Sequence, residues 1–156
     1  VLSVTIRPKK GYNIIQQKLI PYKIGIYASR YYLANSPPIN AVDDLLRHHF
    51  IGYIEEHVFC EDLRYHEEIS PHLQIVYKST TIHTQRMAIE TGLGLGLLPH
   101  YVAYGNANLV NLLPEMQFAR EYWISSGTDL RQFADLKRTW DFVISCSNES
   151  KRIFFP

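Results

Sequence analysis

Ser79–Tyr101 reads STTIHTQRMAIETGLGLGLLPHY, and this segment decides the fold. Its first half predicts a helix that begins after Thr80 or Thr81, because a hydroxyl there can accept from the free amide groups of the first turn. Gly92 can end that helix in the left-handed conformation that glycine adopts without strain. Gln85 and Arg86 interrupt the apolar stripe of this helix.

The second half of the segment predicts a buried strand followed by another helix. Leu93–Leu98 contains only leucine and glycine and is too short for a long helix. Pro99 suits the first turn of a helix, where no backbone N–H is needed. Two helix N-termini therefore stand close together in sequence. Because helix N-termini attract anions, this segment is where we expect a small acidic ligand.

Strands and helices alternate along the rest of the chain. Strands are predicted at the alternating segment Val1–Arg7, at Lys18–Tyr27 with Pro21 as punctuation, and at Phe50–Ile54, His72–Tyr77 and Glu121–Ser125. Helices are predicted at Arg30–Ala34, at Asn40–His48 with Asn40 as its cap, from Pro99 to about Tyr104, and at the C-terminus. Residues 55–71 look polar and irregular. This interleaving predicts an α/β fold with a ligand at the strand ends.

Composition limits the class of protein. The 156 residues have 46% hydrophobic content and a net charge of +1, which fits one domain or two small lobes and argues against a strong nucleic-acid footprint. Cys60 and Cys146 are too few for a disulfide framework and predict a reducing, cytoplasmic location. The sequence contains no apolar run of about 18 residues, so we predict no membrane partner.

The residues that could carry metal or nucleotide chemistry favour simpler interpretations. Gly92, Gly94 and Gly96 follow a helix, whereas a nucleotide-binding loop places its glycines before one. His57 and Cys60 have ligand-like spacing, but no second pair stands at zinc-site spacing. We therefore predict no metal and no cofactor.

No catalytic set is apparent either. The chain lacks a Gly-x-Ser-x-Gly nucleophile elbow. The pairs Glu55–Glu56 and Glu67–Glu68 lie in a polar stretch typical of a solvated face. Tyr27, Tyr31 and Tyr32 could stack on bases, but at this net charge packing is the better interpretation. We predict that the chain is not an enzyme.

An ordered set of segments resembles the effector-binding domain of LysR-type transcriptional regulators. No single segment is specific, but their order covers nearly the whole chain. The segments are Tyr27–Ala34, Asp43–Ile51, Thr80–Tyr101, Leu109–Pro114, Tyr122–Ile124 and Asp129–Phe142.

This resemblance implies a two-lobed fold like that of type II periplasmic binding proteins. Residues 18–125, approximately, would form a complete second lobe with its crossover strands, and residues 1–17 and 126–156 a partial first lobe. The winged helix-turn-helix, the linker helix and the opening of the first lobe would be absent. Promoter DNA would then be bound only through that missing N-terminal domain.

The resemblance also implies an effector and self-association. A small, organic-acid-like effector would lie in the inter-lobe cleft. The expected contacts are Thr80, Thr81, Ile82 and His83 at one helix start, Pro99, His100 and Tyr101 at the next, and Arg7 after the first strand. For the threonines, capping of the helix is an equal alternative, and for Arg7 solvation at the surface is an equal alternative. For His100 and Tyr101 the cleft is slightly favoured over packing in the core.

Family members form dimers or tetramers, and the apolar face of the last helix is the expected contributor. Its residues are Leu130, Phe133, Leu136, Trp140 and Val143. The alternative function is a solute-binding protein of an uptake system, which has the same lobed fold. An upstream helix-turn-helix would favour the regulator, and an upstream secretion signal would favour the alternative.

Overall fold

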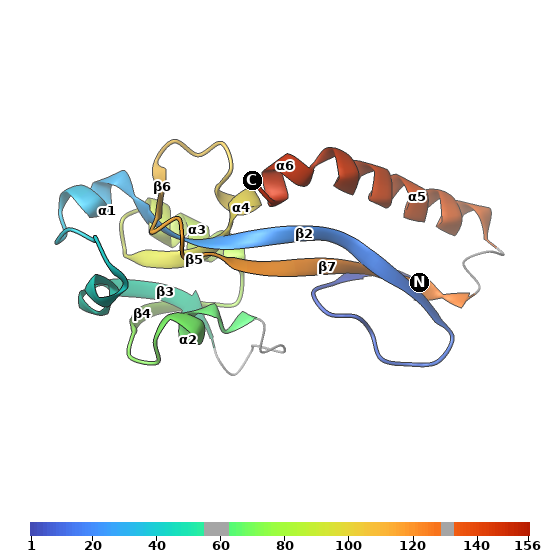
Figure 1. Ribbon diagram of the computed structural model, residues 1–156, viewed down its shortest axis with the longest axis horizontal. Coiled ribbons are helices and arrows are strands. Elements are labelled where there is room, and N and C mark those ends of the chain that lie inside the picture. Colours follow the sequence, from blue (N-terminus) through green and yellow to red (C-terminus); the bar gives the residue numbers. More distant parts are fainter. Residues whose placement is uncertain (55–62, 129–132) are drawn as a thin grey trace. The chain divides into compact units, whose positions relative to one another are not determined.

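The computed structural model describes residues 1–54, 63–128 and 133–156 (Figure 1). The chain folds into two compact units. Unit 1 comprises Val1–Lys23 and Ala119–Pro156, and unit 2 comprises Ile24–Phe118. The expectations for Glu55–Glu56, His57, Cys60 and Asp129–Arg131, with Leu130 among them, fall outside the described residues.

Unit 2 is built on a mixed sheet. Its strands are the second half of β2 (Ile14–Ser29), β3 (His49–Tyr53), β4 (Gln74–Ser79), β5 (Leu95–Pro99) and β6 (Leu109–Leu112). β3 runs parallel to both β4 and β5, whereas β2 is antiparallel to β5 and β6. This topology confirms the predicted α/β class.

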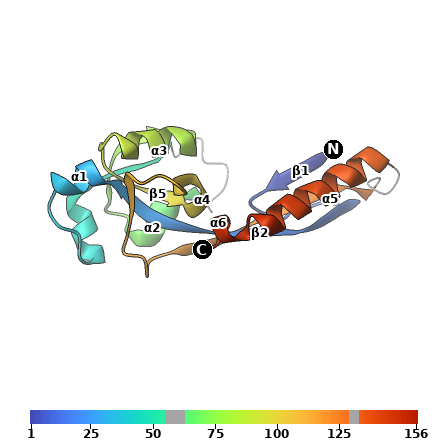
Figure 2. The same cartoon turned by 90° about the horizontal axis from the view of Figure 1, so that it is seen from above.

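The helices of unit 2 follow the strands in sequence. They are α1 (Arg30–Ala34), the 3₁₀ helix η1 (Val42–Arg47), α2 (Tyr65–Ile69), α3 (Ile82–Glu90) and α4 (His100–Ala103). α3 packs against β3, β4 and β5 and also contacts α4 (Figure 2). The helix predicted after Thr81 is therefore confirmed, and it connects two strands of one sheet.

The core of unit 2 explains the Leu–Gly run of β5, which is buried at every position. A Cβ on Gly96 would lie 2.4 Å from Cδ1 of Ile89, and one on Gly94 would lie 2.5 Å from the backbone oxygen of His49. The glycines therefore allow α3 and β3 to approach β5 closely. Around them pack the buried residues Tyr27, Ile51, Ile89, Leu98, Val102, Ala103 and Leu109.

Unit 1 contains the first half of β2, two further strands and the C-terminal helices. β1 (Leu2–Thr5) pairs antiparallel with β7 (Phe118–Gly127), and β7 neighbours β2. The helices are α5 (Ala134–Glu149) and α6 (Lys151–Phe154). Buried Ile124 and Trp140 form the core, with Leu2, Ile15, Leu19, Leu136, Val143 and Ile144 packed against them.

Three local predictions were wrong. The helix predicted from Asn40 is a 3₁₀ helix from Val42 with Ala41 as its N-cap; the Asp44 carboxylate accepts from the backbone N of Asn40 (2.9 Å) and Ala41 (3.0 Å), so Asn40 stays outside the helix. β2 continues through Pro21 without a break, as a strand can where the missing N–H is not needed by the ladder. The stretch expected to be irregular contains α2, whose Tyr65 is buried.

Candidate functional site

The carboxyl ends of the three parallel strands of unit 2 meet at one edge, which we call the carboxyl edge. Tyr53 at the end of β3 lies opposite Ser79 at the end of β4. On the other side of β3, Ile51 pairs with Gly96, so β5 ends at Pro99, just beyond the level of Tyr53. Open α/β sheets bind ligands beyond the carboxyl ends of their strands, so this edge is the first place to look.

The first turn of α3 begins directly after β4 and offers polar groups to solvent. Thr81 is its N-cap, and its Oγ1 accepts from the backbone N of Thr84 at 3.2 Å. Buried Ser79 supports the turn, because its Oγ accepts from the backbone N of Thr81 at 3.2 Å. The predicted cap is confirmed. Of the two threonines considered, Thr81 is the one that caps.

Two backbone N–H groups remain available at this helix start. A helix gives no internal acceptor to its first amides, and in the part of the chain that the structure describes no group accepts from those of Ile82 and His83. The side chains of Thr80, Thr81 and His83 are exposed, whereas Ile82 packs partly against the core. The turn therefore presents amides, hydroxyls and an imidazole, a set that suits an anionic or polar group.

The second helix start is turned inward. α4 is only four residues long, and buried Pro99 precedes it without a side-chain cap. The His100 side chain is 7% exposed, and its Nδ1 is hydrogen-bonded to the Tyr27 hydroxyl. Tyr101 packs partly against the core of unit 2. The structure thus places His100 in the core, whereas the sequence favoured an open position for it.

The Tyr27–His100 pair is a buried hydrogen bond between β2 and α4. Burial raises the pKa of Tyr27 to about 12, so its phenol keeps its proton. The tautomer of His100 determines which of the two groups donates. The rings meet edge to face, with centroids 5.8 Å apart and an interplanar angle of 77°.

Gly25 makes room for this arrangement and was not recognised in the sequence. A Cβ at this position would lie 3.0 Å from Cε1 of His100 and 2.8 Å from Oδ1 of Asn111. Gly25 is opposite Leu98 in the sheet. Nothing in the local sequence around Gly25 signals this role, because both neighbours come from distant segments.

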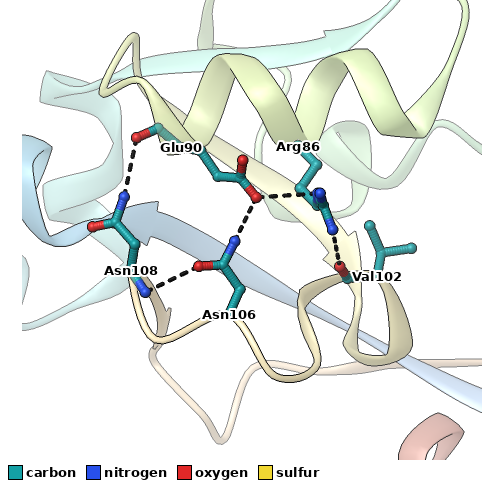
Figure 3. A network of polar contacts seen from close by, with 5 residues as sticks. All are labelled: Arg86, Glu90, Val102, Asn106 and Asn108. Carbon is teal, nitrogen blue, oxygen red and sulfur yellow. Dashed lines mark hydrogen bonds and ion pairs between the residues drawn. The ribbon is translucent and has the colours of Figure 1, made fainter.

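A polar network ties the two helices of the site together (Figure 3). The Arg86 guanidinium pairs with Glu90 at 3.1 Å and donates to the backbone oxygen of Val102 at 3.4 Å. Asn106 donates to the Glu90 carboxylate, and Nδ2 of Asn108 donates to the Glu90 backbone oxygen at 3.3 Å. The network links α3 to α4 and to the loop before β6, and so limits how far the two helices can separate.

The expected effector contacts divide between the two units. Thr80–His83 and Pro99–Tyr101 all lie at the carboxyl edge of unit 2, because β4 and β5 flank β3. Arg7 belongs to unit 1, where it is exposed after β1 and its backbone oxygen accepts from Thr5 Oγ1 at 2.7 Å.

Metal-ligand clusters and membrane-spanning helices are both missing from the described residues. Across residues 1–54, 63–128 and 133–156, no three His, Cys, Asp or Glu side chains come together as metal ligands. No helix in these ranges has the length and apolar character needed to cross a membrane.

The family comparison covers nearly the entire chain. The model of the LysR substrate binding domain matches residues 2–145. The chain belongs to this family. This family is that of LysR-type transcriptional regulators, so membership favours the regulator over the solute-binding protein considered as an alternative. A comparison with curated protein sequences finds no match.

Solved structures share the fold, at low identity. The CrgA regulatory domain of Neisseria meningitidis gives a TM-score of 0.76 at 15% identity, covering 92% of this chain and 74% of that one. Full-length AphB of Vibrio cholerae gives 0.69 at 19% identity, covering 92% of this chain and 50% of that one.

A third solved structure holds a ligand. The CcmR regulatory domain of Synechocystis PCC6803, in complex with 2-PG, gives a TM-score of 0.67 at 14% identity, covering 94% of this chain and 73% of that one. These likenesses show a LysR regulatory-domain fold, like that of type II periplasmic binding proteins.

Proposed function

We propose that this chain is the effector-sensing part of a LysR-type transcriptional regulator and that it binds a small anionic molecule at the carboxyl edge of unit 2. The observation that carries the proposal is the first turn of α3. The backbone amides of Ile82 and His83, for which the described residues supply no acceptor, and the hydroxyls of exposed Thr80 and Thr81 stand at the positive end of a nine-residue helix.

The chemistry of this turn favours a carboxylate or a similar oxygen-rich group. Backbone amides and hydroxyls donate to such oxygens, and His83 adds a donor beside them. Arg7 belongs to unit 1, so it stays a sequence-based expectation and is not part of this proposal. The CcmR domain in complex with 2-PG supports a small-molecule ligand for a domain of this fold.

His100 takes a different role in this proposal. Because its Nδ1 is already hydrogen-bonded to the Tyr27 hydroxyl, we assign His100 to holding the carboxyl edge in place and not to contact with the effector. Pro99 and Tyr101 shape the same edge.

Regulation follows from a difference in affinity between two states. An effector shifts a conformational equilibrium only if it binds one state better than the other. In the proposed regulator, unit 2 corresponds to the second lobe and unit 1 to part of the first. A separate N-terminal domain would bind promoter DNA in the cytoplasm, and self-association would couple the sensing domains to it.

A matched pair of hydroxyl variants tests the site. Thr81→Val removes the exposed capping hydroxyl, whereas Thr91→Val removes an exposed hydroxyl at the opposite end of α3, where Oγ1 donates to the Ala88 backbone oxygen at 2.9 Å. Calorimetric titration with acetate, succinate, benzoate and 2-PG measures binding. We expect Thr81→Val to weaken binding by about 1–3 kcal/mol and Thr91→Val to leave it unchanged.

Stability must be measured beside affinity, because loss of the cap costs about 1 kcal/mol in itself. Equal affinity of Thr81→Val and the unaltered chain, with both folded, would place the effector elsewhere. Equal weakening by both substitutions would show that helix stability and not contact is responsible.

A further inference from the structure

Gln85 is a buried polar residue on the face of α3 that packs against the sheet. Its side chain is 2% exposed, similar to that of Ile89 one turn later. Within the part of the chain that the structure describes, no group accepts a hydrogen bond from Nε2 of Gln85. Buried amide groups are nearly always paired, so this exception calls for a physical reason.

The position of Gln85 directs its amide toward the carboxyl edge. Side chains of a helix tilt toward its N-terminus, so each covers the turn before its own Cα. Gln85 is four residues after Thr81, and its backbone N donates to the Thr81 oxygen at 3.2 Å. Helix geometry therefore predicts that its amide lies beneath the first turn of α3, the turn in which the Ile82 and His83 amides have no acceptor among the described residues.

An unpaired buried amide lowers stability, whereas an apolar side chain of the same length at this position would not. Methionine or leucine would continue the apolar stripe between Ile82 and Ile89. The Gln85 amide is a buried hydrogen-bond donor near the N-terminus of a helix. Such a donor is better explained by ligand binding than by folding stability.

We propose that Gln85 is a specificity-determining residue: its Nε2 donates to an oxygen of the effector that enters beneath the first turn of α3. This inference rests on the proposed function and adds to it a second layer of donors. The backbone amides of Ile82 and His83 donate to one oxygen of a carboxylate, and Nε2 of Gln85 donates to the other.

The proposal identifies the class of ligand more narrowly. Backbone and side-chain amide donors at one helical turn suit a group with two oxygen acceptors, such as a carboxylate, better than an ammonium group, to which only Gln85 Oε1 and the threonine hydroxyls can accept. Uncharged molecules with one acceptor would use only the outer amides and bind more weakly.

The test compares Gln85→Met with Gln74→Met, an exposed glutamine on β4. Sodium acetate is titrated into the ¹⁵N-labelled chain, with sodium chloride at equal ionic strength as the reference. The backbone amides of Ile82 and His83 and the side-chain amide of Gln85 are followed by NMR. Thermal midpoints of all variants are measured without acetate.

We expect saturable shifts at Ile82, His83 and the Gln85 side chain in the unaltered chain and in Gln74→Met. Gln85→Met should raise the apparent Kd at the backbone amides about tenfold or more, since a partner of a bound oxygen is lost. Its thermal midpoint should be equal to or above that of the unaltered chain, because a buried unpaired amide has been removed.

Two outcomes overturn the inference alone. One is an unchanged Kd in Gln85→Met while Thr81→Val weakens binding, and the other is a lowered thermal midpoint in Gln85→Met, which would give the amide a structural role. Absence of saturable shifts at Ile82 and His83 in the unaltered chain overturns the proposed site and this inference together.

Discussion

Gly92 and Gly105 both have positive φ angles, +83° and +75°, but their surroundings differ. Gly92 ends α3, and a Cβ there would lie 2.7 Å from Cδ1 of Tyr31. At Gly105 nothing lies within 4 Å of such a Cβ. The two positions therefore separate the cost of a left-handed backbone from the cost of a side-chain collision.

Gly105→Ala should lower the free energy of unfolding by about 1 kcal/mol, the cost of placing a Cβ in the left-handed region. Gly92→Ala should lower it by about 2 kcal/mol, because Tyr31 must also move. Urea unfolding measures both. In a Tyr31→Ala background the Gly92→Ala cost should fall to the Gly105→Ala value, and an unchanged difference would contradict this account.

His48 is a buried titratable residue between α1 and β3. Its side chain is 1% exposed, and Nδ1 is 3.1 Å from the Tyr32 hydroxyl. Burial lowers the pKa of His48. Arg47 and His49 act in the same direction, and Asp44 opposes them. The folded chain therefore favours the neutral imidazole more than the unfolded chain does.

This difference predicts acid sensitivity. Below about pH 6.5, the unfolded chain binds a proton at His48 that the folded chain resists, so stability falls as the pH falls. Above that pH both states hold a neutral ring and the effect disappears. His48→Gln should therefore flatten the decline in stability on acidification, measured by urea unfolding at several pH values. The exposed His72→Gln is the control, and an equal slope in all three proteins would count against the prediction.

At the scale of elements, the position of α3 depends on more than its apolar face. Arg86 and Glu90 form an ion pair one helical turn apart, and Glu90 also accepts from Asn106 (Figure 3). The Glu90 side chain is 24% exposed. A half-buried carboxylate with several donors contributes more than an exposed pair of the same spacing.

Glu90→Ala should lower the free energy of unfolding by about 2 kcal/mol, because Arg86 and Asn106 lose a charged acceptor. Asp141→Ala breaks the Lys137–Asp141 pair of α5, which has the same spacing but is more than half exposed. That change should cost only a few tenths of a kcal/mol. Chemical denaturation measures the free energy of unfolding of both variants. Similar losses of that free energy would mean that the network adds nothing beyond a surface ion pair.

For the whole molecule, self-association remains a prediction, but its basis has changed. Leu136, Trp140 and Val143, expected to face a partner, pack against the sheet of unit 1. Phe133 and Phe142 are 56% and 67% exposed. Phe142 on α5 and Phe133 at its N-cap are therefore the exposed apolar side chains that we expect to contribute to self-association.

Phe142→Ser should weaken self-association by about tenfold or more without lowering the thermal midpoint, because an exposed ring is removed. Sedimentation velocity over a range of concentrations measures this. Phe155→Ser, which removes an exposed ring that packs on Lys23, is the matched control. A strictly monomeric chain at high concentration would refute the prediction.

The order and type of most elements could be predicted from sequence alone because their signals are local. Thr81 caps α3 through an amide three residues away, and Gly92 ends the helix through its own φ angle. The uncharged leucine and glycine residues of β5 predict by themselves that this strand is buried. These signals, in the order that the LysR family shares, were enough to predict the fold and to direct attention to the two helix starts.

What only the tertiary structure decided is which polar groups at those starts face outward. His100 is buried because two residues of β2 make a place for its ring. Tyr27 is hydrogen-bonded to it, and Gly25 has no side chain that would collide with it. Gln85 looked like an interruption of an apolar stripe, and the sheet beneath α3 makes it a buried donor. A side chain's exposure depends on neighbours that are distant in sequence, so no local pattern encodes it, whereas caps and turns are settled within a few residues of the chain.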